Sequence, residues 1–165
     1  MHADLILVCH ASTAAVRSAS FPAGEPLEAA GEADAFKAAT GLRPAERVWC
    51  APSVAARQTA AALGLEARVE PMIRDCDFGR WAGHPMANVV RDEPEAFRGW
   101  MTDPGSAPHG GEALTELLLR VASWVDECRQ QAGTTIAVTH SAVIRAAIVA
   151  AIEATAATFW RLDVG

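Results

Sequence analysis

Two histidines each stand directly after a short apolar run. His10 follows residues 5–9 (LILVC), and His140 follows residues 135–139 (TIAVT). Runs of this length are too short for helices and predict buried parallel strands. An imidazole can attack an electrophile or move a proton near neutral pH. Because ligands of open α/β sheets bind at the carboxyl ends of the strands, we expect both rings to converge on one substrate atom.

The elements that must position these histidines alternate along the chain. Apolar runs predict strands at residues 4–9, 47–50, 67–70, 135–138 and 158–164, and apolar periodicity predicts helices at 27–41, 52–63, 93–101, 112–131 and 142–152. Residues 11–26, 71–85 and 103–111 predict loops. This alternation is typical of a three-layer α/β/α fold with a mostly parallel sheet of about five strands flanked by helices. With 165 residues, the chain is expected to form one domain over residues 1–165.

Composition narrows the classes of function. The net charge is −6, from 14 basic and 20 acidic residues, which argues against nucleic-acid binding because that needs a basic surface. No apolar run reaches the roughly 18–20 residues of a membrane span, and no signal peptide is visible. We therefore expect a cytoplasmic protein with no membrane partner. The four cysteines have no CxxC spacing, and no Cys or His pair has the spacing of a metal site, so no metal is expected.

Five short segments share their residue types and their order with one known family. They are Cys9-His10-Ala11, Ala51-Pro52 with Gln58-Thr59-Ala60, Asp75-x-x-Phe78-Gly79-x-Trp81-x-Gly83, Gly110-Gly111-Glu112, and Val138-Thr139-His140-Ser141 with Ile144-Arg145. In these segments the chain resembles the histidine phosphatase superfamily, the phosphoglycerate mutase-like proteins. Each motif is weak alone, but together they cover nearly the whole chain in the right order.

The resemblance implies a phosphomonoesterase that acts on a small phosphorylated metabolite. His10 would attack phosphorus and form a phosphohistidine that water then hydrolyses. His140 would donate to the phosphoryl oxygens, and Asp75 would protonate the leaving oxygen. The family requires no metal or other cofactor, so the protein itself must supply the positive charge that stabilises the phosphoryl group.

Two arginines that the family places at the phosphate are replaced in this chain. The residue before the nucleophile is Cys9, and the second position is Ala55. Loss of one preorganised donor typically costs about 10²- to 10³-fold in rate. Arg17, in the loop after His10, and Arg57, on the same predicted helix as Ala55, are the candidate phosphate-binding replacements.

Other residues near the expected site allow more than one interpretation. The motif from Asp75 to Gly83 resembles the acid loop of the family, and Arg74 and Arg80, at and near its two ends, are further candidate replacements. Asp75 could instead cap a turn or pair with Arg74. Glu112 is expected to complement the dipole at the start of the long helix, with a secondary phosphate-binding role at the edge of the pocket.

Two other functions stay open at the level of sequence. Loss of both arginines favours a catalytically weak or inactive phosphatase-like protein that binds a phosphorylated ligand or a partner protein. Cys9 beside His10 could instead act as a reactive thiol. The family also continues past residues 158–164 into a further strand, whereas this sequence stops at Gly165, so either the sheet is one strand smaller or the sequence is truncated. An uncovered sheet edge at that position would favour a homodimer.

Overall fold

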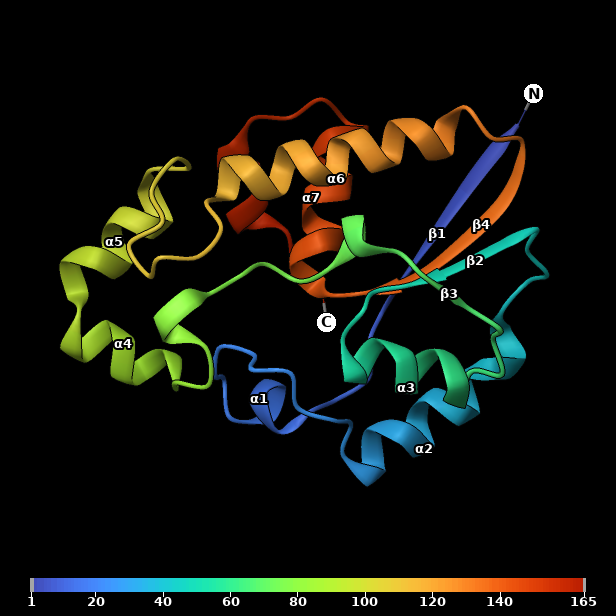
Figure 1. Ribbon diagram of the computed structural model, residues 1–165, viewed down its shortest axis with the longest axis horizontal. Coiled ribbons are helices and arrows are strands. Elements are labelled where there is room, and N and C mark those ends of the chain that lie inside the picture. Colours follow the sequence, from blue (N-terminus) through green and yellow to red (C-terminus); the bar gives the residue numbers. More distant parts are fainter. Residues whose placement is uncertain (1, 165) are drawn as a thin grey trace.

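The computed structural model describes residues 2–164 and contains a four-stranded parallel sheet (Figure 1). The strands are β1 (Ala3–Cys9), β2 (Arg47–Cys50), β3 (Arg68–Val69) and β4 (Gly133–Thr139). Their order across the sheet is β1-β4-β2-β3, and every neighbouring pair is parallel. β4 is central and buried from residue 135 to residue 139, which suits its apolar and β-branched sequence.

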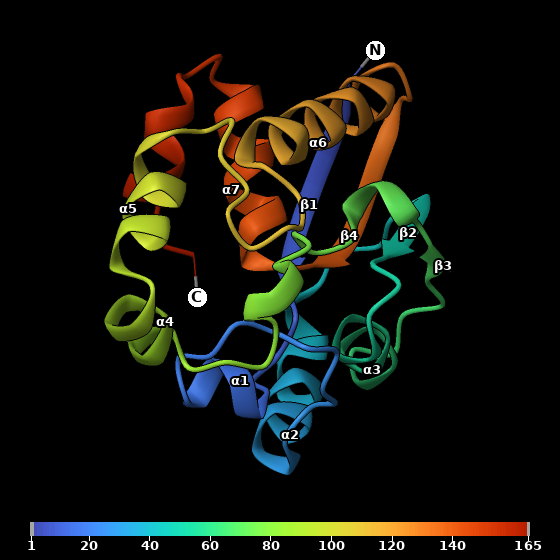
Figure 2. The same ribbon diagram turned by 60° about the vertical axis from the view of Figure 1, so that its left-hand side comes forward.

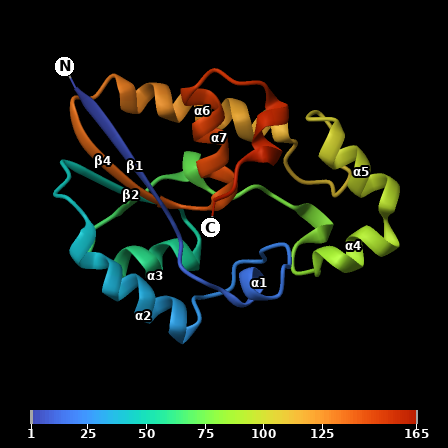
Figure 3. The same cartoon turned by 180° about the vertical axis from the view of Figure 1, so that it is seen from behind.

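Helices cover both faces of the sheet. α6 (Leu114–Arg129) and α7 (Ser141–Ala151) pack together on one face, while α3 (Val54–Ala62) lies on the other with α2 (Ala29–Ala38) outside it (Figures 1 and 3). The buried side of α6 is apolar, as its periodicity predicted. The predicted three-layer α/β/α fold is therefore confirmed. Within residues 2–164, no helix is both long and apolar enough to cross a membrane.

A further group of helices lies near the carboxyl ends of the strands. It consists of α1 (Ala14–Arg17), α4 (Met86–Asp92) and α5 (Pro94–Thr102) (Figure 2). The sequence predicted α5 but not the other two. α1 is a single turn whose N-terminus is capped by the Thr13 side chain, and an element this short leaves no periodic signal.

The last predicted strand, residues 158–164, is wrong. Residues Ala156–Arg161 form a 3₁₀ helix, η4, so the sheet described here has four strands where about five were expected. The Thr-Phe-Trp run has the composition of a strand, but side-chain packing decides otherwise. Phe159 is buried in the core, and the rings of Trp160 and Trp100 meet edge-on with 4.7 Å between their centroids. The sheet edge at which a homodimer was expected is therefore absent, and the edge strands are β1 and β3.

Candidate active site

The register of β1 and β4 places the two histidines side by side. Cys9, the last residue of β1, is paired with Thr139, the last residue of β4. The backbone N–H of His10 continues this ladder and donates to the carbonyl of Thr139 at 2.8 Å. Neighbouring parallel strands are about 4.8 Å apart, and the ring centroids of His10 and His140 are 4.9 Å apart with a 68° interplanar angle. The two rings therefore converge, as their strand-end positions predicted.

His10 is held in the form that a nucleophile requires. Its Nδ1 lies 2.8 Å from the carbonyl oxygen of Ala11, and because a carbonyl can only accept, Nδ1 carries the proton. The lone pair is then on Nε2. Burial lowers the pKa of the His10 imidazole, which favours the neutral ring. The backbone N–H of Ala11 donates to Oγ1 of Thr59 at 3.0 Å, which fixes the turn that carries this carbonyl.

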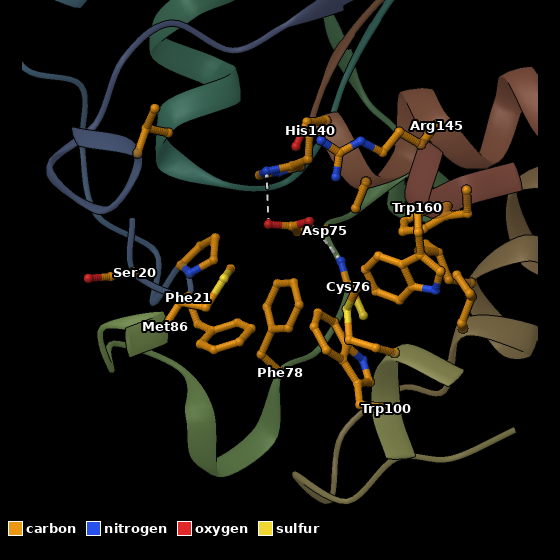
Figure 4. Close-up of a pocket in the computed structure, with 18 of the residues that line it drawn as sticks. Ser20, Phe21, Asp75, Cys76, Phe78, Met86, Trp100, His140, Arg145 and Trp160 are labelled. Atoms are coloured by element: carbon orange, nitrogen blue, oxygen red, sulfur yellow. Dashed lines mark hydrogen bonds and ion pairs between the residues drawn. The ribbon is translucent and has the colours of Figure 1, made fainter. Parts of the chain in front are cut away.

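His140 has a different partner, the carboxylate of Asp75. The distance from His140 Nδ1 to Asp75 Oδ2 is 3.2 Å, and the His140 side chain is only 6% exposed (Figure 4). His140 is also the N-cap residue of α7, so the positive end of that helix dipole faces the same space. Asp75 Oδ1 accepts from the backbone N–H of Cys76 at 2.9 Å, which orients the carboxylate toward His140.

Buried hydrogen bonds hold the segment that carries Asp75. Oγ1 of Thr139 donates to the carbonyl of Ile73 at 2.7 Å and ties the segment directly to the end of β4. The Arg120 guanidinium, from α6, donates to the carbonyl of Met72 at 2.6 Å. Both anchors lie within three residues of Asp75, so the carboxylate is positioned by the core of the domain rather than by a free loop.

Glu112 belongs to this support and does not line the cavity beside the histidines. Its two carboxylate oxygens accept from Arg120 at 2.8 and 2.7 Å, and one of them also accepts from Arg74 at 3.1 Å. The side chains of Glu112 and Arg120 are 7% and 8% exposed. A buried pair in which both partners are satisfied fixes local structure. The structure thus places Glu112 as an anchor of residues 75–83, which we call the acid segment, away from its expected position at the phosphate pocket.

The acid segment crosses residues 109–112, the segment before α6, at very short range. This close approach explains why two positions are glycine. A Cβ on Gly111 would overlap the carbonyl of Asp77, and a Cβ on Gly79 would overlap the carbonyl of His109. The carbonyl of Asp77 accepts from the backbone N–H of Glu112 at 2.8 Å. The crossing therefore requires glycine at both positions and joins the two segments that carry Asp75 and Glu112.

A cavity of about 370 Å³ opens beside the histidines (Figure 4). His10, Asp75, His140 and Arg145 line one end of it. Aromatic and other apolar side chains line the rest, chiefly from α4, α5, η4 and the acid segment, with others from α1, residues 21–22 and α6. Within residues 2–164, no three His, Cys, Asp or Glu side chains lie close enough together to hold a metal ion.

The two arginines proposed from the sequence are not brought to this cavity. Arg17 is exposed and forms an ion pair with Glu28, with Nε and Nη2 each 2.9 Å from Oε1. Arg57 is exposed on the outer side of α3. Neither residue lines the cavity beside His10.

Arg145 does line the cavity, and sequence reasoning missed it as a candidate. Its Nε is buried without a hydrogen-bond partner among the described residues, and its guanidinium carbon lies 5.9 Å from the centre of the Phe159 ring. Figure 4 shows its side chain beside His140. The helical spacing could have identified it. Arg145 stands four residues after Ser141, the first residue of α7, and residues four apart on a helix lie on the same face.

Cys9 does not have the properties of a reactive thiol. Burial and the neighbouring Asp75 carboxylate raise its pKa, while the positive charge of Arg145 opposes this shift. A raised pKa keeps the sulfur protonated and therefore weakly nucleophilic. The structure therefore argues against the thiol interpretation, and Cys9 does not line the cavity beside His10.

Comparison with known proteins gives this architecture a family. The sequence pattern of the Histidine phosphatase superfamily (branch 1) matches residues 5–165. The chain belongs to this superfamily. It is 32% identical over 108 residues to phosphoserine phosphatase 1 of Hydrogenobacter thermophilus, covering 64% of this chain and 51% of that protein. It is 30% identical over 127 residues to a bifunctional protein of Mycobacterium tuberculosis, covering 76% of this chain and 34% of that protein.

The fold also matches solved structures of the superfamily. The alpha-ribazole phosphatase from Shigella flexneri superposes with a TM-score of 0.85 at 22% identity, covering 98% of this chain and 85% of that one. At this identity the likeness concerns the fold. The chain spans between a third and about half of the length of the two curated relatives named above.

Proposed function

We propose that the chain is a phosphomonoesterase that hydrolyses a small phosphorylated metabolite through a phosphohistidine on His10. The observation that carries the proposal is the pairing of a neutral, Nδ1-protonated His10 with a His140–Asp75 couple at one end of a single cavity. Membership of the superfamily supports a phosphatase. The intermediate and the substrate are inferred from the geometry and the family resemblance.

In the first step, Nε2 of His10 attacks phosphorus, so that a P–N bond forms as the P–O bond to the leaving group breaks. Asp75 donates a proton to the leaving oxygen, which departs as a neutral alcohol. His140 donates a hydrogen bond to the phosphoryl oxygens. In the second step, water attacks phosphorus, its proton returns to Asp75, and the P–N bond breaks to release phosphate and neutral His10.

The charge of the phosphoryl group needs positive partners in the same cavity. Arg145 supplies a guanidinium, and the N-terminus of α7 supplies backbone N–H groups and the positive end of a helix dipole. We assign to Arg145 the electrostatic role that the family gives to the arginines at the positions of Cys9 and Ala55.

One observation favours the second candidate function, a phosphatase-like protein that binds a phosphorylated ligand without turning it over. A smaller cavity of about 230 Å³ adjoins His10, and Ala55 and Glu25 are among its lining residues. The negative charge of Glu25 therefore lies beside the place where the family has an arginine. A carboxylate there supplies no positive charge to stabilise the transferring phosphoryl group, which favours a protein without turnover.

Acid-labile labelling tests the leading proposal. The protein is mixed with a ³²P-labelled phosphomonoester, quenched in alkali, and assayed for protein-bound label that acid releases. We expect label on the native chain and on His84→Ala, which removes an exposed histidine that does not line the cavity, and none on His10→Ala.

Equal label on His10→Ala would overturn the assignment of the nucleophile. Absence of both label and turnover, together with binding of vanadate or phosphate that His140→Ala abolishes, would favour the ligand-binding candidate. Isothermal titration calorimetry with inorganic vanadate supplies that second measurement.

A further inference from the structure

The cavity beside His10 has two chemically unlike ends. The charged side chains that line it, Asp75 and Arg145, lie with the histidines at one end (Figure 4). The opposite part, which we call the apolar end, is lined by side chains from α4, α5, η4 and the acid segment. These are chiefly Phe78, Met86, Phe97, Trp100, Met101 and Trp160.

The apolar end offers few partners to a polar leaving group. Two described hydroxyl residues line the cavity: Ser141, which follows His140 in the chain, and Ser20, whose Oγ already lies 2.8 Å from Oγ of Ser18. Among the aromatic side chains of this end, Trp100 and Trp160 each carry an indole N–H group. Sugar hydroxyls, a carboxylate or an ammonium group would lose water on entering this end without gaining a matching hydrogen bond or charge, which is unfavourable.

The walls are instead suited to an apolar group. The Trp100 ring meets the rings of Phe78 and Trp160 edge-on, which presents a continuous hydrocarbon surface. Met86 and Met101 are flexible and polarizable, so they can adapt to the shape of a ligand. A volume of about 370 Å³ is at the lower end of the range for small-molecule pockets and suits one or two rings or a short alkyl chain beside the phosphoryl group.

We propose that the substrate is a phosphate monoester of an apolar alcohol or phenol, whose hydrocarbon part occupies the apolar end while its phosphoryl group meets His10, His140 and Arg145. This inference rests on the proposed phosphomonoesterase function and specifies its substrate class. It differs from the polar substrate named for the phosphoserine phosphatase relative.

A homologous series of substrates tests the proposal. kcat/KM is measured for ethyl, butyl and hexyl phosphate, and for glycerol 3-phosphate and O-phosphoserine. Burial of one methylene group is worth up to about fourfold in binding, so we expect hexyl phosphate to exceed ethyl phosphate by at least about tenfold. We also expect it to exceed both polar esters. The polar alcohols are the better leaving groups, so intrinsic reactivity would give the opposite order.

Paired variants locate the effect in the apolar end. Met86 is 39% exposed, so Met86→Ser should fold, and we expect it to reduce the ratio of hexyl to ethyl phosphate at least about threefold. Leu119→Ser is the matched control, because Leu119 is 73% exposed on α6 and does not line the cavity. The control should retain the ratio of the native chain.

A binding measurement separates failure of this inference from failure of the proposed function. Trp100 and Trp160 line the cavity, so tryptophan fluorescence reports on ligands that enter it. Hexylphosphonate, which cannot be hydrolysed, should bind at least tenfold more tightly than methylphosphonate, whether or not the chain turns over any ester. Turnover without chain-length preference, or faster turnover of phosphoserine, would overturn the inference about the substrate and leave the phosphatase function intact. If the protein hydrolyses none of the esters, equal binding of the two phosphonates would overturn the inference about the substrate.

Discussion

His10 and His140 occupy equivalent positions at the ends of neighbouring strands, yet they have different partners. His10 Nδ1 donates to a backbone carbonyl, whereas His140 Nδ1 faces the carboxylate of Asp75. A carbonyl fixes the proton on Nδ1 and leaves Nε2 free to attack. A carboxyl group beside His140 Nδ1 suits a ring that donates a hydrogen bond from Nε2. The partner of each ring, rather than its position on a strand, therefore distinguishes nucleophile from donor.

The largest expected effect is on the His10 side of this comparison. His10→Ala removes the atom that bonds to phosphorus, so we expect kcat to fall by about 10⁴-fold or more in a steady-state assay of phosphate release. The His84→Ala variant should retain native activity. A smaller loss in His10→Ala than in a His140 variant would reverse the assignment of the two roles.

A smaller loss is expected for the second histidine. His140→Gln retains a hydrogen-bond donor but not a ring that can be charged, so we expect kcat to decrease by about 10²- to 10³-fold. Acid-labile label on His10 should still form, more slowly, in rapid-quench measurements. Complete loss of labelling with intact folding would show that His140, too, is indispensable to P–N bond formation.

Arg145 is expected to contribute as a preorganised phosphate donor. Arg145→Ala should lower kcat/KM by about 10²-fold, and Arg145→Lys should restore part of it because a point charge remains. Arg57→Ala removes an exposed arginine outside the cavity and serves as the control. Equal activity of Arg145→Ala and the native chain would exclude the role proposed here.

The titration of His10 should reflect its burial. Burial lowers the pKa of His10 below its ordinary value of 6.5, so this ring should take up its proton only below that pH. Between that lowered pKa and 6.5, the unfolded chain binds the proton and the folded chain does not. Folding stability therefore rises with pH across this window and is lost as the pH falls through it.

Histidine ring resonances followed by NMR against pH check this expectation, with His10→Ala identifying the His10 signal. A His10 midpoint at or above 6.5 would contradict the buried neutral ring. In single-turnover experiments, the rate of His10 phosphorylation should fall about tenfold per pH unit below the lowered pKa, because the charged ring cannot attack.

The smallest expected effect is on folding stability, through the hydrogen bond that ties the segment before Asp75 to the end of β4. Thr139→Val keeps the shape of the side chain but leaves the Ile73 carbonyl without its buried donor, so we expect unfolding free energy to decrease by about 1–2 kcal/mol in urea titration. Thr102→Val, at an exposed site where Oγ1 donates to the Arg98 carbonyl, should change it by less. Identical stabilities would show that this bond does not anchor the acid segment.

The sequence by itself determined the fold class and the place of the two histidines. Long apolar periodicity in residues 112–131 and short β-branched runs before His10 and His140 are strong local signals. Parallel strands bring their carboxyl ends to one edge, so convergence follows once both runs are strands. The motif order was equally local, and the superfamily it suggested is confirmed over residues 5–165.

Tertiary structure decided what depends on contacts between distant segments. Residues 158–164 have the composition of a strand, but packing of Phe159 and Trp160 makes a 3₁₀ helix. Arg17 was free to reach the site on sequence grounds, yet Glu28 holds it at the surface. Arg145 lines the cavity because α7 starts at the site, although its place in a sequence motif did not identify it as a site residue. The apolar end of the pocket likewise exists only where α4, α5 and η4 meet, since no local pattern encodes which side chains from separate elements will share a cavity.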